Sequence, residues 1–220
     1  MRKLKKEELA RRVAKELEEG YYINLGIGMP SLIPNYIPDG MKVTLLSENG
    51  IIGLGPYPTK DEVDPDLTNA SKQSSTINAG GVVSDSVEAF AMIRGGHVDL
   101  TVLGGMQVDQ HGNLANWKIP GKKVKGMGGA MDLVAGAKRV IVMMQHVNRA
   151  GETKILKECN LPLTGKAVVS ELYTDIARFK FIDGKMYLTE YAPETTIEEI
   201  RENTDADFIV AEDICEMDIS

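Results

Sequence analysis

Lys42-Val43-Thr44-Leu45-Leu46-Ser47-Glu48-Asn49-Gly50 joins an apolar, β-branched run to a carboxylate and a turn-forming pair. The apolar run predicts a strand, so Glu48 lies where that strand ends. In open α/β sheets ligands bind outside the carboxyl ends of the strands. This position makes Glu48 a candidate for chemistry rather than an ordinary surface acid.

An alternative interpretation makes the same residues a simple hairpin. Asn-Gly is the strongest short hairpin signal, and Glu48 would then be a solvated acid. The next residues, 51–58, contain two glycines and two prolines and do not alternate as a returning strand does. We therefore expect them to form a shaped loop, whose apolar side chains keep water from the carboxylate.

Outward from this stretch, helical and strand patterns alternate along the chain. Helices are predicted over 5–19, from Ser84 or Asp85 to Gly95, over 132–137 and after a Thr196–Glu199 capping box; strands are predicted over 21–25, 98–103 and 139–144. Residues 57–81 form a long polar excursion, and loops of this length are usually functional or mobile. Asp183-Gly184 is a favoured hairpin turn between 179–182 and 185–188. The predicted fold class is α/β: a three-layer open sheet, mostly parallel, with helices on both faces and a C-terminal hairpin.

Length, charge and cysteine content exclude several classes of protein. The chain has 220 residues, enough for a full core without disulfides or metal, and we expect one domain over 1–220. Its net charge of −7 argues against a nucleic-acid surface. Cys159 and Cys215 lie far apart without a CxxC pattern, which indicates a reducing cytosol rather than a disulfide framework or zinc site. No signal peptide or membrane span is expected, because no apolar run is long enough.

Two glycine pairs invite comparison with dinucleotide-binding loops. After Gly26-Ile27-Gly28 and Gly126-Met127-Gly128, the third glycine of that fingerprint is replaced by Ser31 and Met131, so NAD or FAD binding is not predicted. The backbone N–H groups of Gly26 and Gly28 are instead expected to be open to a ligand.

The three histidines give no support to a hydrolase or a metal site. His97, His111 and His146 lack a neighbouring Ser or Cys in a nucleophile context and do not form a metal-binding motif. His111 lies in turn-forming sequence, where a solvated side chain is expected.

Four blocks in order give the chain a resemblance to a known family. Ser-Glu-Asn-Gly follows Asn-Leu-Gly-Ile-Gly-Met-Pro at 24–30 and precedes Gly-Gly-Met-Gln-Val at 104–108 and Lys-Gly-Met-Gly-Gly-Ala-Met-Asp at 125–132. Together they resemble the β subunit of a family I 3-oxoacid CoA-transferase, of the acetate or butyrate:acetoacetate type. The resemblance covers nearly the whole chain.

The resemblance implies an activity, partners and site residues. Glu48 corresponds to the family's nucleophile, which exchanges CoA between an acyl-CoA, such as acetoacetyl-CoA, and a small carboxylic acid. CoA is then substrate and covalent intermediate, no cofactor is bound permanently, and a separate α subunit completes an α2β2 or larger assembly. The other implied roles are oxyanion or acyl positioning for Gly129, Ala130 and Asn24, and substrate or CoA binding for Gly26, Gly28 and Gly128.

Two other function classes stay open at this point. A sugar-phosphate isomerase or deaminase also presents carboxylates at strand ends of a related α/β fold, and a non-catalytic ligand-sensing subunit could keep the same fold. Lys122, Lys123 and Lys125 are open to two interpretations as well: a solvated surface, or a basic cluster that attracts an anion such as a CoA phosphate.

Overall fold

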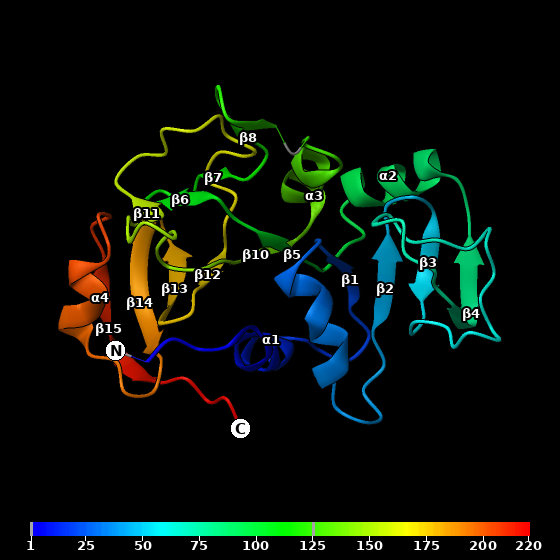
Figure 1. The fold of residues 1–220 in the computed structure, drawn as a ribbon, viewed down its shortest axis with the longest axis horizontal. Helices are drawn as coiled ribbons and strands as arrows, with labels where there is room; N and C mark the ends of the chain where they lie inside the picture. The colour runs from blue at the N-terminus through cyan, green and yellow to red at the C-terminus, as the bar shows by residue number, and fades with distance from the viewer. Residues whose placement is uncertain (1, 125) are drawn as a thin grey trace.

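The computed structural model describes residues 2–124 and 126–220, which form one large sheet with helices on both faces and two small sheets beside it (Figure 1). The order in the large sheet is β15-β14-β13-β12-β10-β5-β1-β2-β3-β4. These ten strands are β1 (Tyr22–Leu25), β2 (Thr44–Ser47), β3 (Ile51–Leu54), β4 (Ile77–Val83), β5 (Leu100–Gly104), β10 (Arg139–Met143), β12 (Glu171–Tyr173), β13 (Ala177–Ile182), β14 (Lys185–Tyr191) and β15 (Ile209–Glu216).

The remaining elements are helices and short strands. The helices are α1 (Lys6–Ala14), the 3-10 helix η1 (Met29–Tyr36), α2 (Ser86–Arg94), α3 (Ala130–Gly136) and α4 (Ile197–Glu202). The small sheets consist of β11 (Ile155–Leu156), β6 (Gln107–Asp109) and β7 (Leu114–Ala115), and of β8 (Lys118–Ile119) with β9 (Lys123–Val124).

The centre of the sheet is parallel, as predicted. Strands β12, β10, β5, β1 and β2 are neighbours that run in one direction. Successive residues of β10 alternate between two cores: Val140 and Val142 belong to one apolar cluster, and Ile141 and Met143 to the other. A strand that is buried on both faces needs consecutive apolar residues. This requirement explains the uninterrupted apolar run that marks β10 in the sequence.

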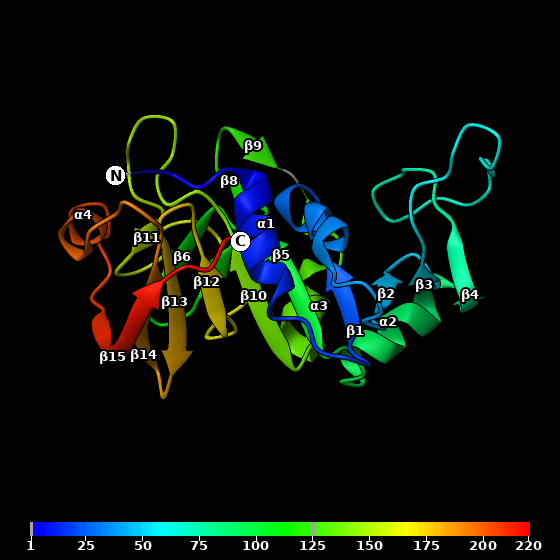
Figure 2. The same ribbon diagram turned by 90° about the horizontal axis from the view of Figure 1, so that it is seen from below.

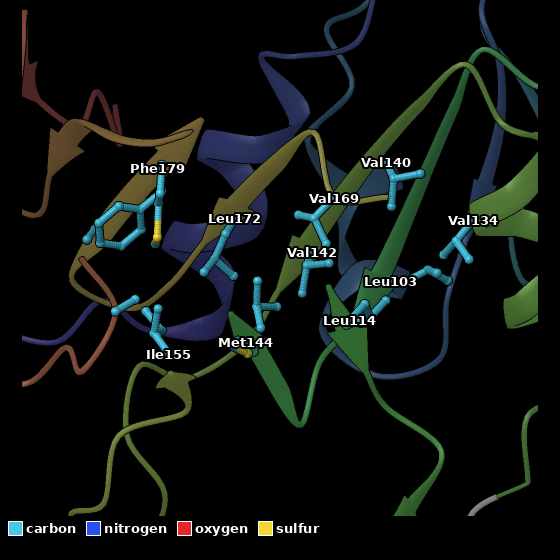
Figure 3. Close-up of a cluster of buried hydrophobic side chains, with 14 of the residues drawn as sticks. Leu103, Leu114, Val134, Val140, Val142, Met144, Ile155, Val169, Leu172 and Phe179 are labelled. Atoms are coloured by element: carbon cyan, nitrogen blue, oxygen red, sulfur yellow. The ribbon is translucent and has the colours of Figure 1, made fainter. Parts of the chain in front are cut away.

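Helices cover both faces of the sheet. On one face α1 and η1 pack on a cluster in which Leu9 and Val13 meet Ile23 and Val102 (Figure 2). On the other face α2, α3 and α4 pack on a second cluster, shown in Figure 3. Strands β5, β10, β12 and β13 contribute Leu103, Val142, Leu172 and Phe179 to this second cluster. The predicted three layers are therefore confirmed.

Both wings of the sheet contain antiparallel pairs. The predicted C-terminal hairpin is β13 and β14, which pair antiparallel across Asp183-Gly184. Both turn residues have positive φ, 51° and 73°, as a type I′ turn requires. The edge strand β15, which follows α4 and pairs parallel to β14, was not predicted.

The segment after Glu48 differs from its prediction. Residues 51–54 are strand β3, which returns antiparallel to β2, rather than the start of a loop. Ser47 pairs with Ile51, so Glu48, Asn49 and Gly50 form the hairpin connection. Gly50 has a φ of 115°, and a Cβ there would overlap Ser84 O. The hairpin interpretation was therefore right about the backbone, and the shaped loop begins only after Leu54.

The first helix is shorter than predicted. It ends at Ala14 rather than near Gly20, and residues 15–17 continue as tight turns, since Leu17 N–H donates to Ala14 O at 3.2 Å. The turns carry Glu16 toward the sheet, where it meets arginine side chains. A long-range ionic contact therefore overrides the local helical pattern.

Beneath α1 lies a buried group of charges, the arginine–glutamate cluster, which consists of Arg12, Glu16, Arg139, Glu171, Arg178 and Glu190. Arg12 contacts Glu190 at 2.5 Å, and Arg178 contacts Glu171 at 2.5 Å. Its three arginines balance its three glutamates. Removing one partner from such a set leaves a buried charge without compensation, which is strongly destabilising. The cluster therefore makes the position of α1 depend on the far end of the chain.

Within the part of the chain that the structure describes, no helix combines the length and the apolar character that crossing a bilayer requires.

Candidate active site

A cleft of about 1130 Å³ lies at the carboxyl ends of the central parallel strands. The last residues of β1, β2, β5 and β10 all line it, namely Leu25, Ser47, Gly104 and Met143. This is where an open α/β sheet binds ligands. Glu48, the first residue after β2, also lines the cleft. The strand-end argument therefore placed the carboxylate in a real cavity.

The Glu48 carboxyl group is half-buried and has one backbone donor. Burial raises its pKa above the ordinary value of 4.5, the N–H of Gly129 donates a hydrogen bond that lowers the pKa in part, and the negative charge of Asp132 raises it further. No ion pair to Glu48 occurs among the described residues. A carboxylate without a cation, held in a partly dry site, is less stabilised than one in water. Such a group is suited to attack a carbonyl.

Gly129 approaches Glu48 so closely that only glycine fits. A Cβ on Gly129 would overlap Glu48 Oε2 and lie 2.9 Å from Phe90 Cε1. Gly129 is the residue before α3, and Gly128 precedes it with a φ of 49°. The glycines of this block therefore let a backbone N–H reach the carboxylate, while both residues line the cleft.

Ala130 has a different environment from the one implied for it. Its N–H donates to Met127 O at 3.0 Å, which closes the turn into α3. Ala130 lines the cleft, but Gly129 is the residue whose N–H reaches Glu48. The oxyanion role of Ala130 stays a prediction.

Asn24 lies one strand away from Glu48 and connects β1 to β2. Its side-chain amide donates to Leu46 O at 3.0 Å, and its Oδ1 accepts from Thr101 Oγ1 at 3.5 Å. Asn24 is 5% exposed and lines the cleft. Its contacts fix the end of β2 just before Ser47 and Glu48, which fits the positioning role implied for it.

The first glycine loop was only partly predicted. The N–H of Gly26 donates to Val102 O at 2.8 Å, so it is part of the sheet rather than open to a ligand. Gly26 nevertheless lines the cleft. Gly28 has a φ of 100° and directly precedes η1, and it is absent from the described residues that line the cleft. Its binding role stays a prediction.

The basic cluster is described only in part. Lys122 is exposed and is not one of the described cleft residues. The backbone of Lys123 belongs to β9, and Lys125 lies outside the described residues. The proposed attraction of an anion by these lysines stays a prediction.

The three histidines differ in burial. His97 and His111 are exposed, whereas His146 is fully buried between Thr174 Oγ1 and Thr204 Oγ1, each 2.9 Å from a ring nitrogen. Burial lowers the pKa of His146 to about 3, and the charges of Lys3 and Lys154 lower it as well. His146 is therefore neutral at physiological pH and belongs to the core. Among the described residues, no group of three or more His, Cys, Asp or Glu could hold a metal ion.

Sequence reasoning missed several residues of the cleft. Asn69, Ala70, Ser71, Gln73 and Ser75 reach it from the long excursion between β3 and β4. Figure 2 shows this excursion, in cyan, on the same edge of the sheet as the loop with β8 and β9. Its length was the one signal in the sequence, since long loops in compact domains are often functional. From the other side, Gln145, Arg149 and Lys154 line the cleft after β10.

The fold and the strand-end glutamate define a class: an open α/β protein with a half-buried carboxylate in a cleft at the carboxyl ends of its parallel strands. The family model described as coenzyme A transferase matches residues 6–203. A relative from Bacillus subtilis, named as a subunit of a probable succinyl-CoA:3-ketoacid coenzyme A transferase, is 55% identical over 95% of this chain and 97% of its own length. The beta subunit of acetate CoA-transferase from Escherichia coli is 51% identical, over 95% of each chain.

Longer relatives match this chain over one part of their length. The human "Succinyl-CoA:3-ketoacid coenzyme A transferase 2, mitochondrial" is 52% identical over 92% of this chain but only 40% of its own length. Among solved structures, an acyl-CoA transferase from Escherichia coli O157:H7 has a TM-score of 0.78 at 22% identity, over 98% of this chain and 44% of that chain. Glutaconate coenzyme A-transferase from Acidaminococcus fermentans has a TM-score of 0.76 at 22% identity, over 98% and 89%. At this identity the two structures show a shared fold.

The chain belongs to the coenzyme A transferase family. The predicted resemblance is confirmed, and with it the prediction of a CoA-transferase subunit with a mostly parallel α/β fold. These relatives give no support to a sugar-phosphate isomerase or to a ligand-sensing subunit.

Proposed function

We propose that this chain is the glutamate-bearing subunit of a CoA-transferase, in which Glu48 carries CoA as a thioester. The observation that supports this most is Glu48 itself, a half-buried carboxylate in the cleft, with a raised pKa, a backbone N–H from Gly129 and no cation in contact among the described residues. A stabilised structural carboxylate would have an arginine or lysine partner, as the glutamates beneath α1 do. The environment of Glu48 instead leaves its charge available for reaction.

The reaction would proceed in two steps for each acid. A Glu48 carboxylate oxygen attacks the thioester carbonyl of an acyl-CoA, giving a mixed anhydride and expelling CoA as thiolate. The thiolate then attacks the glutamyl carbonyl, which forms the glutamyl-CoA thioester and releases the first acid as a carboxylate. The acceptor acid reverses both steps, so the thioester bond is conserved and Glu48 is regenerated.

This chemistry needs no histidine base. A carboxylate is ordinarily ionised at neutral pH, and CoA can leave as thiolate because thiol pKa values lie near ~8.5. What must be stabilised is the oxyanion of each tetrahedral intermediate. One oriented donor contributes roughly 3–4 kcal/mol to such a transition state, and the N–H of Gly129 is the described donor that already points to Glu48.

A separate α subunit completes the proposed enzyme. The Bacillus and Escherichia coli relatives are both named as subunits, the second of them as a beta subunit, and this chain covers almost their whole length. The human relative is a longer single chain. An α2β2 or larger assembly in the cytoplasm is the arrangement we propose, with CoA present only as substrate and covalent intermediate.

Short-chain substrates are the class we propose. The names of the relatives mention succinyl-CoA with a 3-ketoacid, and acetate. An acyl-CoA such as acetoacetyl-CoA, with a small carboxylic acid as acceptor, fits these names. A panel of acetate, butyrate and succinate as acceptors would identify the physiological acid.

Trapping of the thioester tests the proposal. With its α partner and an acyl-CoA but no acceptor acid, the chain should gain the mass of CoA without the acyl group. Borohydride should reduce that thioester and inactivate the enzyme, with peptide mapping placing the change at Glu48. Glu48→Gln should form no adduct. Glu62→Gln is its matched control and should form the adduct normally, because Glu62 is an exposed acid in the excursion. A label on any other carboxylate would contradict the proposal.

A further inference from the structure

Residues 67–75 of the long excursion form a small folded unit, the 67–75 hairpin. Ser75 N–H donates to Leu67 O at 3.0 Å, and Asn69 N–H donates to Gln73 O at 2.9 Å. Asn69 Oδ1 accepts from the N–H groups of Ser71 and Gln73 at 2.9 and 3.1 Å. These contacts lie within the hairpin, so they give it a shape without fixing where it lies.

Two side chains that flank Glu48 hold this hairpin in place. Ser47 Oγ accepts a hydrogen bond from Ala70 N–H at 2.9 Å, and Asn49 Nδ2 donates to Thr68 O at 2.7 Å. Ser47 is buried, with 6% of its surface exposed. The residues directly before and after Glu48 therefore both contact the hairpin through their side chains.

The 67–75 hairpin, which these two hydrogen bonds hold, is also the part of the excursion that faces the cleft. Asn69, Ala70, Ser71, Gln73 and Ser75 all line it. The preceding residues 59–66 are exposed, and none of them is among the described residues that line the cleft. The two side-chain contacts thus coincide with the boundary between cleft wall and free surface.

We infer that Ser47 and Asn49 are positioning residues that hold the 67–75 hairpin as a wall beside Glu48, and that this wall keeps water from the glutamyl-CoA thioester. The inference rests on the proposed function. In the hairpin interpretation of Asn49-Gly50, Asn49 serves only the turn; its contact with Thr68 gives it a second, separate use.

The wall matters because water competes with the acceptor acid for one carbonyl. Attack by a carboxylate on the glutamyl thioester leads to transfer. Attack by water on the same carbon expels CoA as thiol and restores the Glu48 carboxylate, so that acyl-CoA and water yield free acid and CoA. Loss of the wall should therefore raise the rate of hydrolysis without removing the nucleophile.

The test compares two decay rates of the isolated adduct. The complex with the α partner is loaded with acetoacetyl-CoA, freed from excess substrate by gel filtration, and divided between buffer alone and buffer with acceptor acid. Release of CoA thiol in buffer alone reports hydrolysis, and formation of new acyl-CoA reports transfer. The measured quantity is the ratio of the two rates.

Four variants share this assay. Ser47→Ala and Asn49→Ala each remove one contact to the hairpin. Ser170→Ala and Asn203→Ala are matched controls: Ser170 Oγ accepts from Val140 N–H at 3.0 Å, and Asn203 Nδ2 donates to Glu199 O at 2.8 Å, both outside the cleft. Each pair thus loses the same kind of bond, in one case beside Glu48 and in the other within the scaffold.

We expect the ratio of hydrolysis to transfer to rise about five-fold in Ser47→Ala and in Asn49→Ala, the factor that corresponds to one ordinary hydrogen bond. The double variant should show a larger rise, and the controls should match the wild type. An unchanged ratio in the double variant, or an equal rise in the controls, overturns the inference while the proposed function stands. Failure of the wild type to form the adduct overturns both.

Discussion

Glu48 and the glutamates of the arginine–glutamate cluster lie beside or within the same sheet but experience opposite surroundings. Glu171 and Glu190 are almost fully buried, and each contacts arginine side chains. Glu48 is half-buried, its pKa is raised, and a backbone N–H is its described donor. Burial penalises the charge of both kinds of carboxylate, but only the cluster supplies opposite charges to offset it. The difference suggests that the partners of a buried glutamate, rather than its burial, separate a structural role from the chemical role that we propose for Glu48.

Replacing Glu48 itself tests most directly whether its role differs from that of the cluster glutamates. Glu48→Gln keeps the shape but provides a far poorer nucleophile, so turnover should fall by roughly 10⁴-fold or more, the scale expected when a covalent nucleophile is removed. The free energy of unfolding at pH 7 should stay equal or rise, because an uncompensated charge is lost. Steady-state transfer and thermal melting of the assembled complex measure the two effects. Retained turnover would assign the chemistry to another residue.

Removal of an arginine from the cluster should have the reverse profile. Arg178→Met leaves Glu171 and Glu190 short of a partner, so the free energy of unfolding should fall by about 3–5 kcal/mol. Specific activity of the protein that remains folded should be little changed. Lys138→Met is the control, because its contact with Asp99 at 2.7 Å is exposed and should be worth less than about 1 kcal/mol. Denaturant unfolding measures both variants. Equal losses of unfolding free energy in Arg178→Met and Lys138→Met would show that the buried cluster contributes no more stability than an exposed ion pair.

A side chain at position 129 should affect Glu48 more than the stability of the fold. In Gly129→Val the new side chain overlaps Glu48 Oε2 and displaces the carboxylate from its donor. We expect turnover to fall on the order of 100-fold, comparable to the loss of one oriented donor, with a smaller relative change in melting temperature. Gly121→Val is a control, because Gly121 has open space around its Cβ position, although its φ of 72° adds local strain. Parallel losses of stability and turnover in Gly129→Val would assign Gly129 to packing.

The smallest expected effect is the response to pH, where the two kinds of glutamate should differ in sign. Burial raises the pKa of folded Glu48, so its ionisation lowers the free energy of unfolding as pH rises through that pKa. For Glu16, burial is outweighed by the hydrogen bond from Arg139 and the charge of Arg178, which lower its pKa to about 2.

The stability that Glu16 provides is therefore present above its ordinary pKa of 4.5 and is lost as pH falls toward about 2. Melting temperatures of Glu48→Gln and Glu16→Gln, each compared with the wild type across this range, measure both contributions. The advantage of Glu48→Gln should grow as pH rises, and the penalty of Glu16→Gln should shrink as pH falls. If the stability of both variants relative to the wild type changed in the same direction with pH, the distinction between the two glutamates would be contradicted.

Local sequence signals carried the prediction of the fold and of Glu48. Apolar runs at 98–103 and 139–144 indicate strands buried on both faces, and the strand that ends at Ser47 places Glu48 at the binding edge. The role of Gly129 came from the resemblance, since a glycine near a helix start has many uses. The structure adds that a Cβ at this position has no room.

What the sequence could not show depends on contacts between distant segments. Strand β3 was missed because its Gly53 interrupts the apolar alternation; in the structure Gly53 has a φ of 85° and lies against Gly81 of β4. The arginine–glutamate cluster joins α1 and the turns after it to strands β10, β12, β13 and β14, and nothing local distinguishes Glu190 from a surface acid. The hydrogen bonds of Ser47 and Asn49 to the 67–75 hairpin were hidden for the same reason.

The contact between Arg12 and Glu190 also constrains how the chain folds while it is being synthesised. The two residues are 178 positions apart, and the contact is part of what holds α1 against the sheet. At about 5–20 residues per second, roughly 9–36 s pass between the translation of Arg12 and that of Glu190. During that time the apolar face of α1 can already meet Ile23 and Val102, and Arg12 can already pair with Glu16, but Glu190 is still missing. The buried ionic contacts beneath α1 should therefore be completed only after the last hairpin emerges.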